Sequence, residues 1–143
     1  TVNTSMAAIK GMKKNNWGRI INMASVSVKE PLSYLALSNT IRSAVTSWGK
    51  TLSIESGKHN ITVNNILTGF FNTERLNQLN SEKAKKFNVS TEEVFDKMSE
   101  MVPLKRIGEP QEFGYLVSFL SSEYADYING TNIPIDGGLL KSM

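Results

Sequence analysis

The sequence contains no cysteine and a single histidine, His59. Without cysteine the protein forms no disulfide, no thiolate metal site and no cysteine nucleophile, and its composition suits the reducing cytoplasm, where we expect it to lie. No apolar run approaches the roughly 18 residues that a helix needs to cross a membrane, so we expect no membrane association. We interpret His59 as a surface residue in a turn, and we expect no metal site.

A clustered basic face is also absent. The 143 residues carry a net charge of +3, but lysines are scattered among acidic residues, as in "NSEKAKKF" and "STEEVFDKMSE". The densest cluster, Lys83, Lys85 and Lys86, is typical of a solvated helix face, whereas nucleic-acid binding requires a basic face with interleaved aromatic residues. We therefore expect no nucleic-acid partner. The length and the 40% hydrophobic content predict one globular domain over residues 1–143.

Short β-branched segments alternate with helical patterns along the chain. Apolar residues recur at three- and four-residue spacing from Leu35 to Ser56, which predicts the longest helix, and Gly57 stands where a C-cap glycine belongs. Two further patterns predict the beginnings of helices. Ser90 with Glu93 forms a capping-box pattern, and Pro110 suits the first turn of a helix. The other predicted elements are the end of a helix in 6–18, strands in 18–25, 60–69 and 129–138, two short polar helices in 70–102, and a helix in 109–127.

This alternation predicts an α/β fold with a parallel sheet and flanking helices. Ligands of such sheets bind at the carboxyl ends of the strands. Ser25 and the pair Thr68–Gly69 follow two of the predicted strands. We therefore expect a small-molecule site on this rim, covered by a flap of residues 70–102.

Three segments carry a resemblance to a known family. They are "GRIINMAS", "SGKHNITVNNILTGFFNTE" and "VPLKRIGEPQEFGYLVSFLSSEYADYINGTNIPIDGG", of which the last is the most specific. Together they resemble the short-chain dehydrogenase/reductases, and in particular proteins similar to 3-oxoacyl-acyl-carrier-protein reductases. The resemblance implies a Rossmann-like fold of which this chain holds the last three of seven strands, NAD or NADP as cofactor, a carbonyl or alcohol substrate, and a homo-oligomer.

The family's catalytic residues carry over only in part. Ser25 stands where a serine binds the substrate carbonyl. The positions of the family's proton-donating tyrosine and of its lysine fall on Leu35 and Asn39. Leucine transfers no proton, and asparagine binds a ribose hydroxyl but carries no charge that lowers the pKa of a phenol. Tyr34 is one residue out of register and is retained as the alternative acid.

No nearby cation replaces the missing lysine in this interpretation. Lys50 lies almost three helical turns beyond the tyrosine position, and Arg42 is expected to lie off the relevant helix face. For the nicotinamide, the resemblance implies contacts from Gly69 through its open backbone, from Phe71 through a backbone amide, and from Thr73 through its hydroxyl. Thr73 is also a candidate N-cap of the first flap helix.

The chain has no G-x-G-x-x-G pattern, which in this family opens the nucleotide-binding half. It begins with Thr1 in a helical pattern, which either methionine removal or excision from a longer chain explains. Two hypotheses follow. The chain is the C-terminal half of an NAD(P)-dependent oxidoreductase with weakened catalysis, or it is a non-catalytic assembly or binding module, or a truncated remnant, that retains the family's subunit-pairing helices and final strand.

Overall fold

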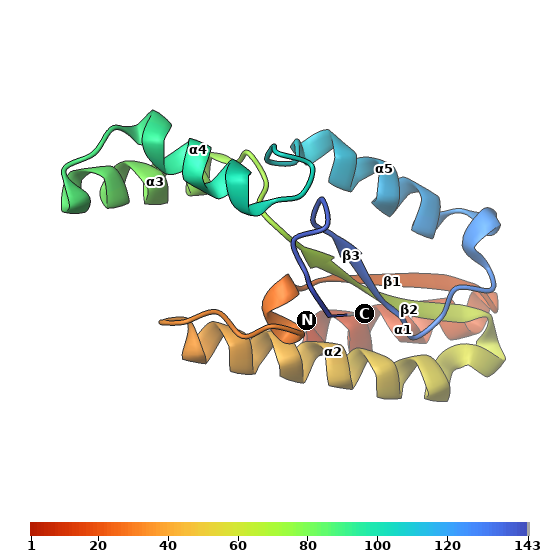
Figure 1. The fold of residues 1–143 in the computed structure, drawn as a ribbon. Coiled ribbons are helices and arrows are strands. Elements are labelled where there is room, and N and C mark those ends of the chain that lie inside the picture. The colour runs from red at the N-terminus through yellow and green to blue at the C-terminus, as the bar shows by residue number, and fades with distance from the viewer. Residues whose placement is uncertain (143) are drawn as a thin grey trace.

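Three parallel strands form the centre of the computed structural model, which describes residues 1–142 (Figure 1). The strand order is β1–β2–β3, and each neighbouring pair is parallel, so the predicted α/β fold is confirmed. The strands are β1 (Gly18–Met23), β2 (Ile61–Thr68) and β3 (Asn132–Ile135). The helices are α1 (Val2–Asn15), α2 (Ala36–Ser56), α3 (Glu74–Phe87), α4 (Thr91–Met101) and α5 (Pro110–Ser121), with short 3-10 turns η1 (Val26–Val28), η2 (Gly57–His59) and η3 (Glu123–Ala125).

The helices cover both faces of the sheet. On one face, Ile9 of α1 and Leu52 of α2 pack against Ile20, Ile61 and Val63 of the strands. On the other face, α5 packs through Leu120 against Ile66, with partly buried neighbours on both sides. The strands contribute side chains to both faces, because successive side chains of a strand point to opposite faces of the sheet. Helices α3 and α4 pack on each other and project from the sheet as an arm, where the sequence predicts the flap (Figure 1).

A row of asparagine side chains crosses the sheet beneath α2. Asn22 Nδ2 donates to Asn65 Oδ1 at 2.9 Å, and Asn65 Nδ2 donates to Asn132 Oδ1 at 2.8 Å. These residues are register partners on β1, β2 and β3. Asn65 is fully buried, and so its amide depends on these bonds for the partners that water would otherwise provide. The row therefore fixes the register of all three strands.

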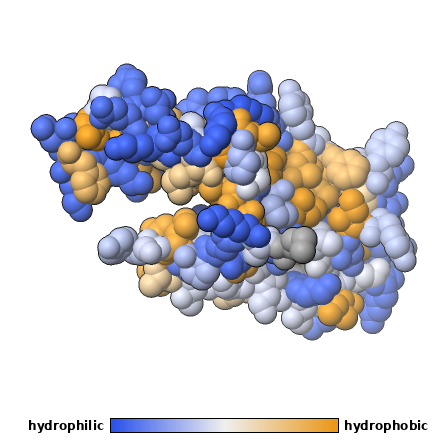
Figure 2. Space-filling view, in the orientation of Figure 1, coloured by the Kyte–Doolittle hydropathy of each residue, from blue (hydrophilic) through white to orange (hydrophobic). Residues whose placement is uncertain are grey.

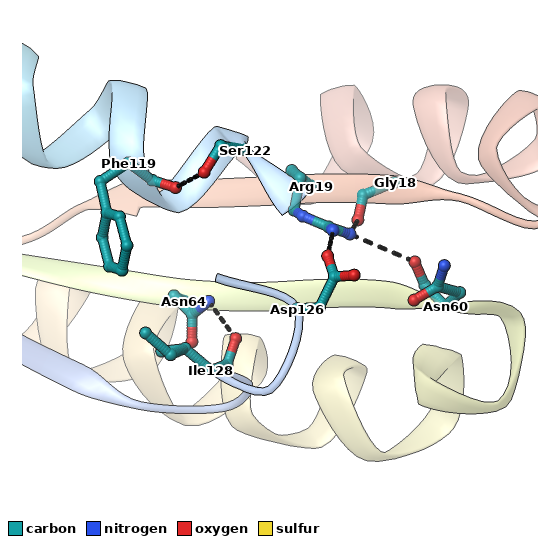
Figure 3. A network of polar contacts seen from close by, with 8 residues as sticks. All are labelled: Gly18, Arg19, Asn60, Asn64, Phe119, Ser122, Asp126 and Ile128. Carbon is teal, nitrogen blue, oxygen red and sulfur yellow. Dashed lines mark hydrogen bonds and ion pairs between the residues drawn. The ribbon is translucent and has the colours of Figure 1, made fainter. Parts of the chain in front are cut away.

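Polar contacts also tie the opposite end of the sheet together (Figure 3). The largely buried guanidinium of Arg19 pairs with Asp126 and donates to the carbonyl oxygen of Gly18 at 2.9 Å. Asn64 Nδ2 donates to the Ile128 carbonyl oxygen at 2.8 Å. These bonds attach the segment between α5 and β3 to the beginnings of β1 and β2. They lie at the end of the sheet away from Ser25 and Thr68, and so we assign them to the fold.

The predicted helix termini are mostly confirmed. Ser90 and Glu93 form the reciprocal capping box of α4, and Pro110 is the first residue of α5. Gly57 is the C-cap of α2, but its backbone stays right-handed, with φ −56° and ψ −36°. The chain continues as η2 and makes its left-handed turn at Asn60, with φ 55°. Asparagine tolerates this conformation better than most residues, so it performs the role expected of the glycine.

None of the helices between residues 1 and 142 is long and apolar enough to cross a membrane. Within the same part of the chain, β1 is an edge strand with a free side. Met23 at its end is 63% exposed.

Gly49 leaves the space that the asparagine row needs. A Cβ at this position of α2 would lie 2.8 Å from Asn65 Oδ1 and 2.9 Å from Asn22 Nδ2. We predict that Gly49→Ala destabilises the protein by about 1–3 kcal/mol, because either the row or the helix must shift. Urea unfolding measures this change.

Gly114→Ala in α5 is the matched control, since a Cβ there meets nothing within 4 Å. Alanine is the better helix former, so this variant should gain about 0.5–1 kcal/mol. A gain of similar size from both substitutions would contradict the packing role of Gly49.

Candidate functional site

The carboxyl ends of β1 and β2 are joined at one carbonyl group. The Ala24 carbonyl oxygen accepts hydrogen bonds from Thr68 Oγ1 at 3.0 Å and from Arg42 Nη1 at 2.9 Å. The Ala24 N–H donates to the Ile66 carbonyl oxygen at 2.8 Å, and Ala24 is fully buried. The two loops expected to carry the site therefore begin from a common fixed point.

Ser25 leaves this point in an extended conformation, with φ −154°, and begins η1. Its Oγ accepts a hydrogen bond from the Ser27 N–H at 3.2 Å. This bond is the turn-capping role of a serine. It uses an oxygen lone pair and leaves the hydroxyl hydrogen without an acceptor among the described residues. Ser25 is half-buried at the sheet rim, so a donor is available there for a carbonyl oxygen.

Gly69, Phe71 and Thr73 line one cavity of about 340 Å³. Hydrophobic residues from the end of β1, from α3 and from α5 form much of the remaining wall, and they include Met23, Leu79 and Phe113. Ser25, Tyr34 and Asn39 are not among the residues that line it. The surface is hollowed between the arm and the N-terminal end of α2 (Figure 2).

The backbone of this loop is tightly fitted. The Gly69 N–H donates to the Ile135 carbonyl oxygen at 3.0 Å, and a Cβ on Gly69 would lie 2.8 Å from Asp136 Cα. Phe71 forms a bridge to Gly108 and packs edge-on against Phe113, with 6.2 Å between the ring centroids. The bridge is formed by the Asn72 N–H, which donates to the Gly108 carbonyl oxygen, and by the Gly108 N–H, which donates to the Phe70 carbonyl oxygen. The Phe71 N–H has no acceptor among the described residues. That N–H is therefore available to a ligand.

Thr73 caps α3, as predicted. Its Oγ1 accepts a hydrogen bond from the Leu76 N–H at 3.3 Å. The hydroxyl hydrogen has no acceptor among the described residues, so capping and ligand binding do not compete for the same proton. Arg75, in the first turn of α3, is the only ionisable side chain among the described residues that line the cavity.

The residues at the beginning of α2 differ in backbone conformation, exposure and hydrogen bonding. Tyr34 has a left-handed backbone, with φ 64°, and its side chain is fully exposed. Leu35 is the N-cap of α2 and is 47% exposed. Asn39 Nδ2 donates to the Leu32 carbonyl oxygen at 2.9 Å, whereas Asn39 Oδ1 is shielded from solvent and has no partner among the described residues.

Arg42 is not among the site residues predicted from the sequence. We expected its side chain to lie off the relevant face of the helix, and its bond to the Ala24 carbonyl oxygen shows that this expectation is wrong. Its spacing of three residues from Asn39 was the available signal, because residues three apart lie on the same side of a helix. The length of the arginine side chain then covers the distance to the strand end.

A second charged pair stabilises the loop between the arm and α5. Arg106 donates to both carboxylate oxygens of Glu112, at 2.7 and 2.6 Å, and the Glu109 N–H donates to the same carboxylate at 2.7 Å. The two bonds from Arg106, followed by the Glu109 N–H, lower the pKa of Glu112 from 4.5 to about 2. Arg106 borders a second, smaller cavity of about 150 Å³ beside Gly137.

Comparison with known proteins identifies the family. Residues 1–140 match the family described as enoyl-(acyl carrier protein) reductase. The chain belongs to the short-chain dehydrogenase/reductases. The NADPH-dependent reductase BacG of Bacillus subtilis is 37% identical over 132 residues, which make up 92% of this chain and 51% of that protein.

Two further relatives agree. The 3-oxoacyl-[acyl-carrier-protein] reductase MabA of Mycobacterium tuberculosis is 31% identical over 132 residues, which make up 92% of this chain and 49% of MabA. The crystal structure of L-sorbose reductase from Gluconobacter frateurii, with NADPH and L-sorbose, has a TM-score of 0.89 at 32% identity, covering 94% of this chain and 52% of that one. The chain thus spans about half the length of the relatives it matches.

The Arg106–Glu112 pair gives a prediction about pH. Because the pKa of Glu112 is lowered by folding, the pair stabilises the folded state above pH 4.5, and this contribution is lost as the pH falls through about 2. In Arg106→Gln the pKa of Glu112 should rise toward its ordinary value. An NMR titration of the carboxyl group measures it, and urea unfolding of both proteins should differ near neutral pH and converge near pH 2. An unchanged Glu112 pKa in the variant would contradict this cause.

Proposed function

We propose that this chain is the nicotinamide- and substrate-binding half of a reductase that converts a small carbonyl compound to an alcohol with NADPH or NADH. One observation carries the proposal: Ser25, which has a free hydroxyl hydrogen, follows the end of β1, and the last residue of β1, Met23, lines the same largely apolar cavity as Gly69, Phe71 and Thr73. The named relatives that use NADPH support the choice of cofactor class. The alcohol-to-carbonyl direction uses the same groups in reverse.

The donors and acceptors of this rim fit a nicotinamide nucleotide. Two donors, the Phe71 N–H and the Thr73 hydroxyl, have no acceptor among the described residues, as a carboxamide oxygen requires. Asn39 Oδ1 is a shielded acceptor without a donor. Asn39 stands at the position of the family's ribose-binding lysine, and its assignment to the cofactor rests on that position, because Oδ1 itself is closed to solvent. We assign Gly69, Phe71, Thr73 and Asn39 to the cofactor.

When bound, the dihydronicotinamide supplies a hydride to the carbonyl carbon. In this proposal the Ser25 hydroxyl donates a hydrogen bond to the carbonyl oxygen. This bond stabilises the negative charge that develops on that oxygen. Phe71 and Thr73 orient the ring, and the hydrophobic wall that includes Phe113 limits the access of water. The product oxygen then requires one proton, which Leu35 does not supply.

Tyr34 is the proposed source of that proton. A bulky residue with positive φ is uncommon, and such strain concentrates at functional positions. Tyr34 has φ 64° and a fully exposed side chain, so its conformation is not explained by burial. We propose that the loop carrying Tyr34 closes over the substrate and brings the phenol to the oxygen held by Ser25.

A second function is supported by exposed apolar side chains on α2. Leu37 is 75% exposed, Ile41 53% and Ile54 73%. Such residues favour contact with another protein surface, and a second copy of this chain is the proposed partner. The chain would then act as an assembly module whose self-association is independent of Ser25. Light scattering of wild type and Ser25→Ala measures that association directly.

Ser25→Ala tests the enzymatic proposal. We predict that it lowers kcat for NADPH-dependent reduction about 100-fold, the usual effect of removing one donor from a developing oxyanion. Ser118→Ala is the matched control, because Ser118 lies exposed on α5 and makes no side-chain hydrogen bond among the described residues. Reduction is followed by loss of NADPH absorbance with a panel of small aldehydes and ketones.

Tyr34→Phe in the same assay isolates the proton donor. A loss of about 100-fold is expected from removal of a general acid. Full activity in Tyr34→Phe would exclude the phenol and leave Ser25 in place. Full activity in Ser25→Ala would contradict the proposed reaction at this site.

A further inference from the structure

Arg75 is the one arginine among the described residues whose guanidinium makes no hydrogen bond and no ion pair. Each of the others donates to a carboxylate or to a carbonyl oxygen, and they are Arg19, Arg42 and Arg106. Arg75 is exposed, and its guanidinium carries five N–H donors and a permanent charge. These donors are therefore open to a ligand.

The position of Arg75 in α3 has no local structural reason. It is the second helical residue after the N-cap Thr73, where the positive end of the helix dipole disfavours a cation. The residues three and four positions further on, Gln78 and Leu79, carry no charge. Glu74 precedes it, but consecutive residues do not face each other on a helix, and the two side chains form no ion pair. Such departures from local preference are expected at functional positions.

Arg75 lines the cavity of about 340 Å³ that also holds the proposed nicotinamide contacts. No carboxylate is found among the described residues of this lining, so nothing in the cavity neutralises the guanidinium. Much of the remaining wall is hydrophobic and includes Leu76 and Leu79 of α3 and Phe113 of α5. An ion pair is stronger in such surroundings than in bulk water. The cavity therefore suits a ligand that has a hydrophobic body and one anionic group.

We infer that Arg75 binds a carboxylate of the substrate, and that the substrate is a small oxo acid. The planar fork of a guanidinium matches the two oxygens of a carboxylate. This inference rests on the proposed function and names its substrate class. Arg75 holds one end of the substrate, while Ser25 binds the carbonyl oxygen at the other. The carbonyl carbon gains the hydride and its oxygen gains a proton while the dihydronicotinamide is oxidised, so the product is a hydroxy acid with its carboxylate unchanged.

A phosphate of the nicotinamide nucleotide is the alternative anion. If Arg75 binds that phosphate, its replacement raises KM for NADPH and slows the reduction of every carbonyl compound alike. If Arg75 binds the substrate, the loss is confined to compounds that carry a carboxylate. A comparison of acids with their neutral esters therefore separates the two sources.

The test uses the 143-residue chain with pyruvate, levulinate and benzoylpropionate, each beside its methyl ester, and follows the loss of NADPH absorbance. Arg75→Gln should lower the ratio of kcat/KM for acid to kcat/KM for ester about tenfold, the usual effect of one charged hydrogen bond. Arg75→Lys should retain part of the ratio, because it keeps the charge without the planar fork. Lys83→Gln is the matched control, since it removes one positive charge from an exposed position of α3 outside the cavity.

A binding measurement needs no turnover. Phenylbutyrate has an aromatic ring and a carboxylate but no ketone, and phenylbutyramide is its neutral analogue. In calorimetric titrations with oxidised nucleotide present, Arg75→Gln should weaken the binding of phenylbutyrate about tenfold relative to that of phenylbutyramide.

An unchanged acid-to-ester ratio in Arg75→Gln, or a wild-type chain that reduces the esters but not the acids, would overturn the inference and leave the proposed function intact. A raised KM for NADPH with an unchanged ratio would assign Arg75 to the cofactor phosphate instead. If the wild-type chain reduces none of these compounds, the calorimetry decides, and an equal change for both ligands overturns the inference. If it also binds neither NADPH nor NADH, the proposed function is overturned and the inference with it.

Discussion

The row Asn22–Asn65–Asn132 is the interaction on which the rest of the structure depends. A one-residue slip of a strand moves every side chain to the other face of a sheet, so register needs a specific determinant. Buried amides provide it, because a slipped pairing would leave Asn65 without partners in a fully buried position. Gly49 of α2 gives the row its space, and the helix is thereby fixed to the same register.

The geometry of the candidate site follows from that register. In the observed register of β1 and β2, the Thr68 hydroxyl donates to the Ala24 carbonyl oxygen. The loops that follow the two strands therefore begin next to each other. With β2 and β3 in step, Gly69 lies against Asp136, where only glycine fits. Arg42 reaches the same carbonyl from α2. Positions far apart in sequence thus form one rim.

The sequence allowed the elements to be predicted because their signals are local. The capping box at Ser90, the proline at Pro110 and the β-branched runs each act within a few residues. The site was predicted only in part. Gly69, Phe71 and Thr73 share a cavity because they share a loop. The spacing of Arg42 from Asn39 indicates its side of the helix, but its bond to the Ala24 carbonyl oxygen depends on tertiary packing. The pairing of the asparagines likewise depends on register, which is a tertiary property.

Titration of the purified chain with NADPH and with NADH, followed by nucleotide fluorescence or heat, tests the central claim that this rim is a nicotinamide site. We predict saturable binding of at least one of the two nucleotides at micromolar to millimolar concentrations. We also predict that nicotinamide mononucleotide competes for the same site. Absence of binding by both nucleotides at millimolar concentrations would contradict the claim and favour the assembly function of α2.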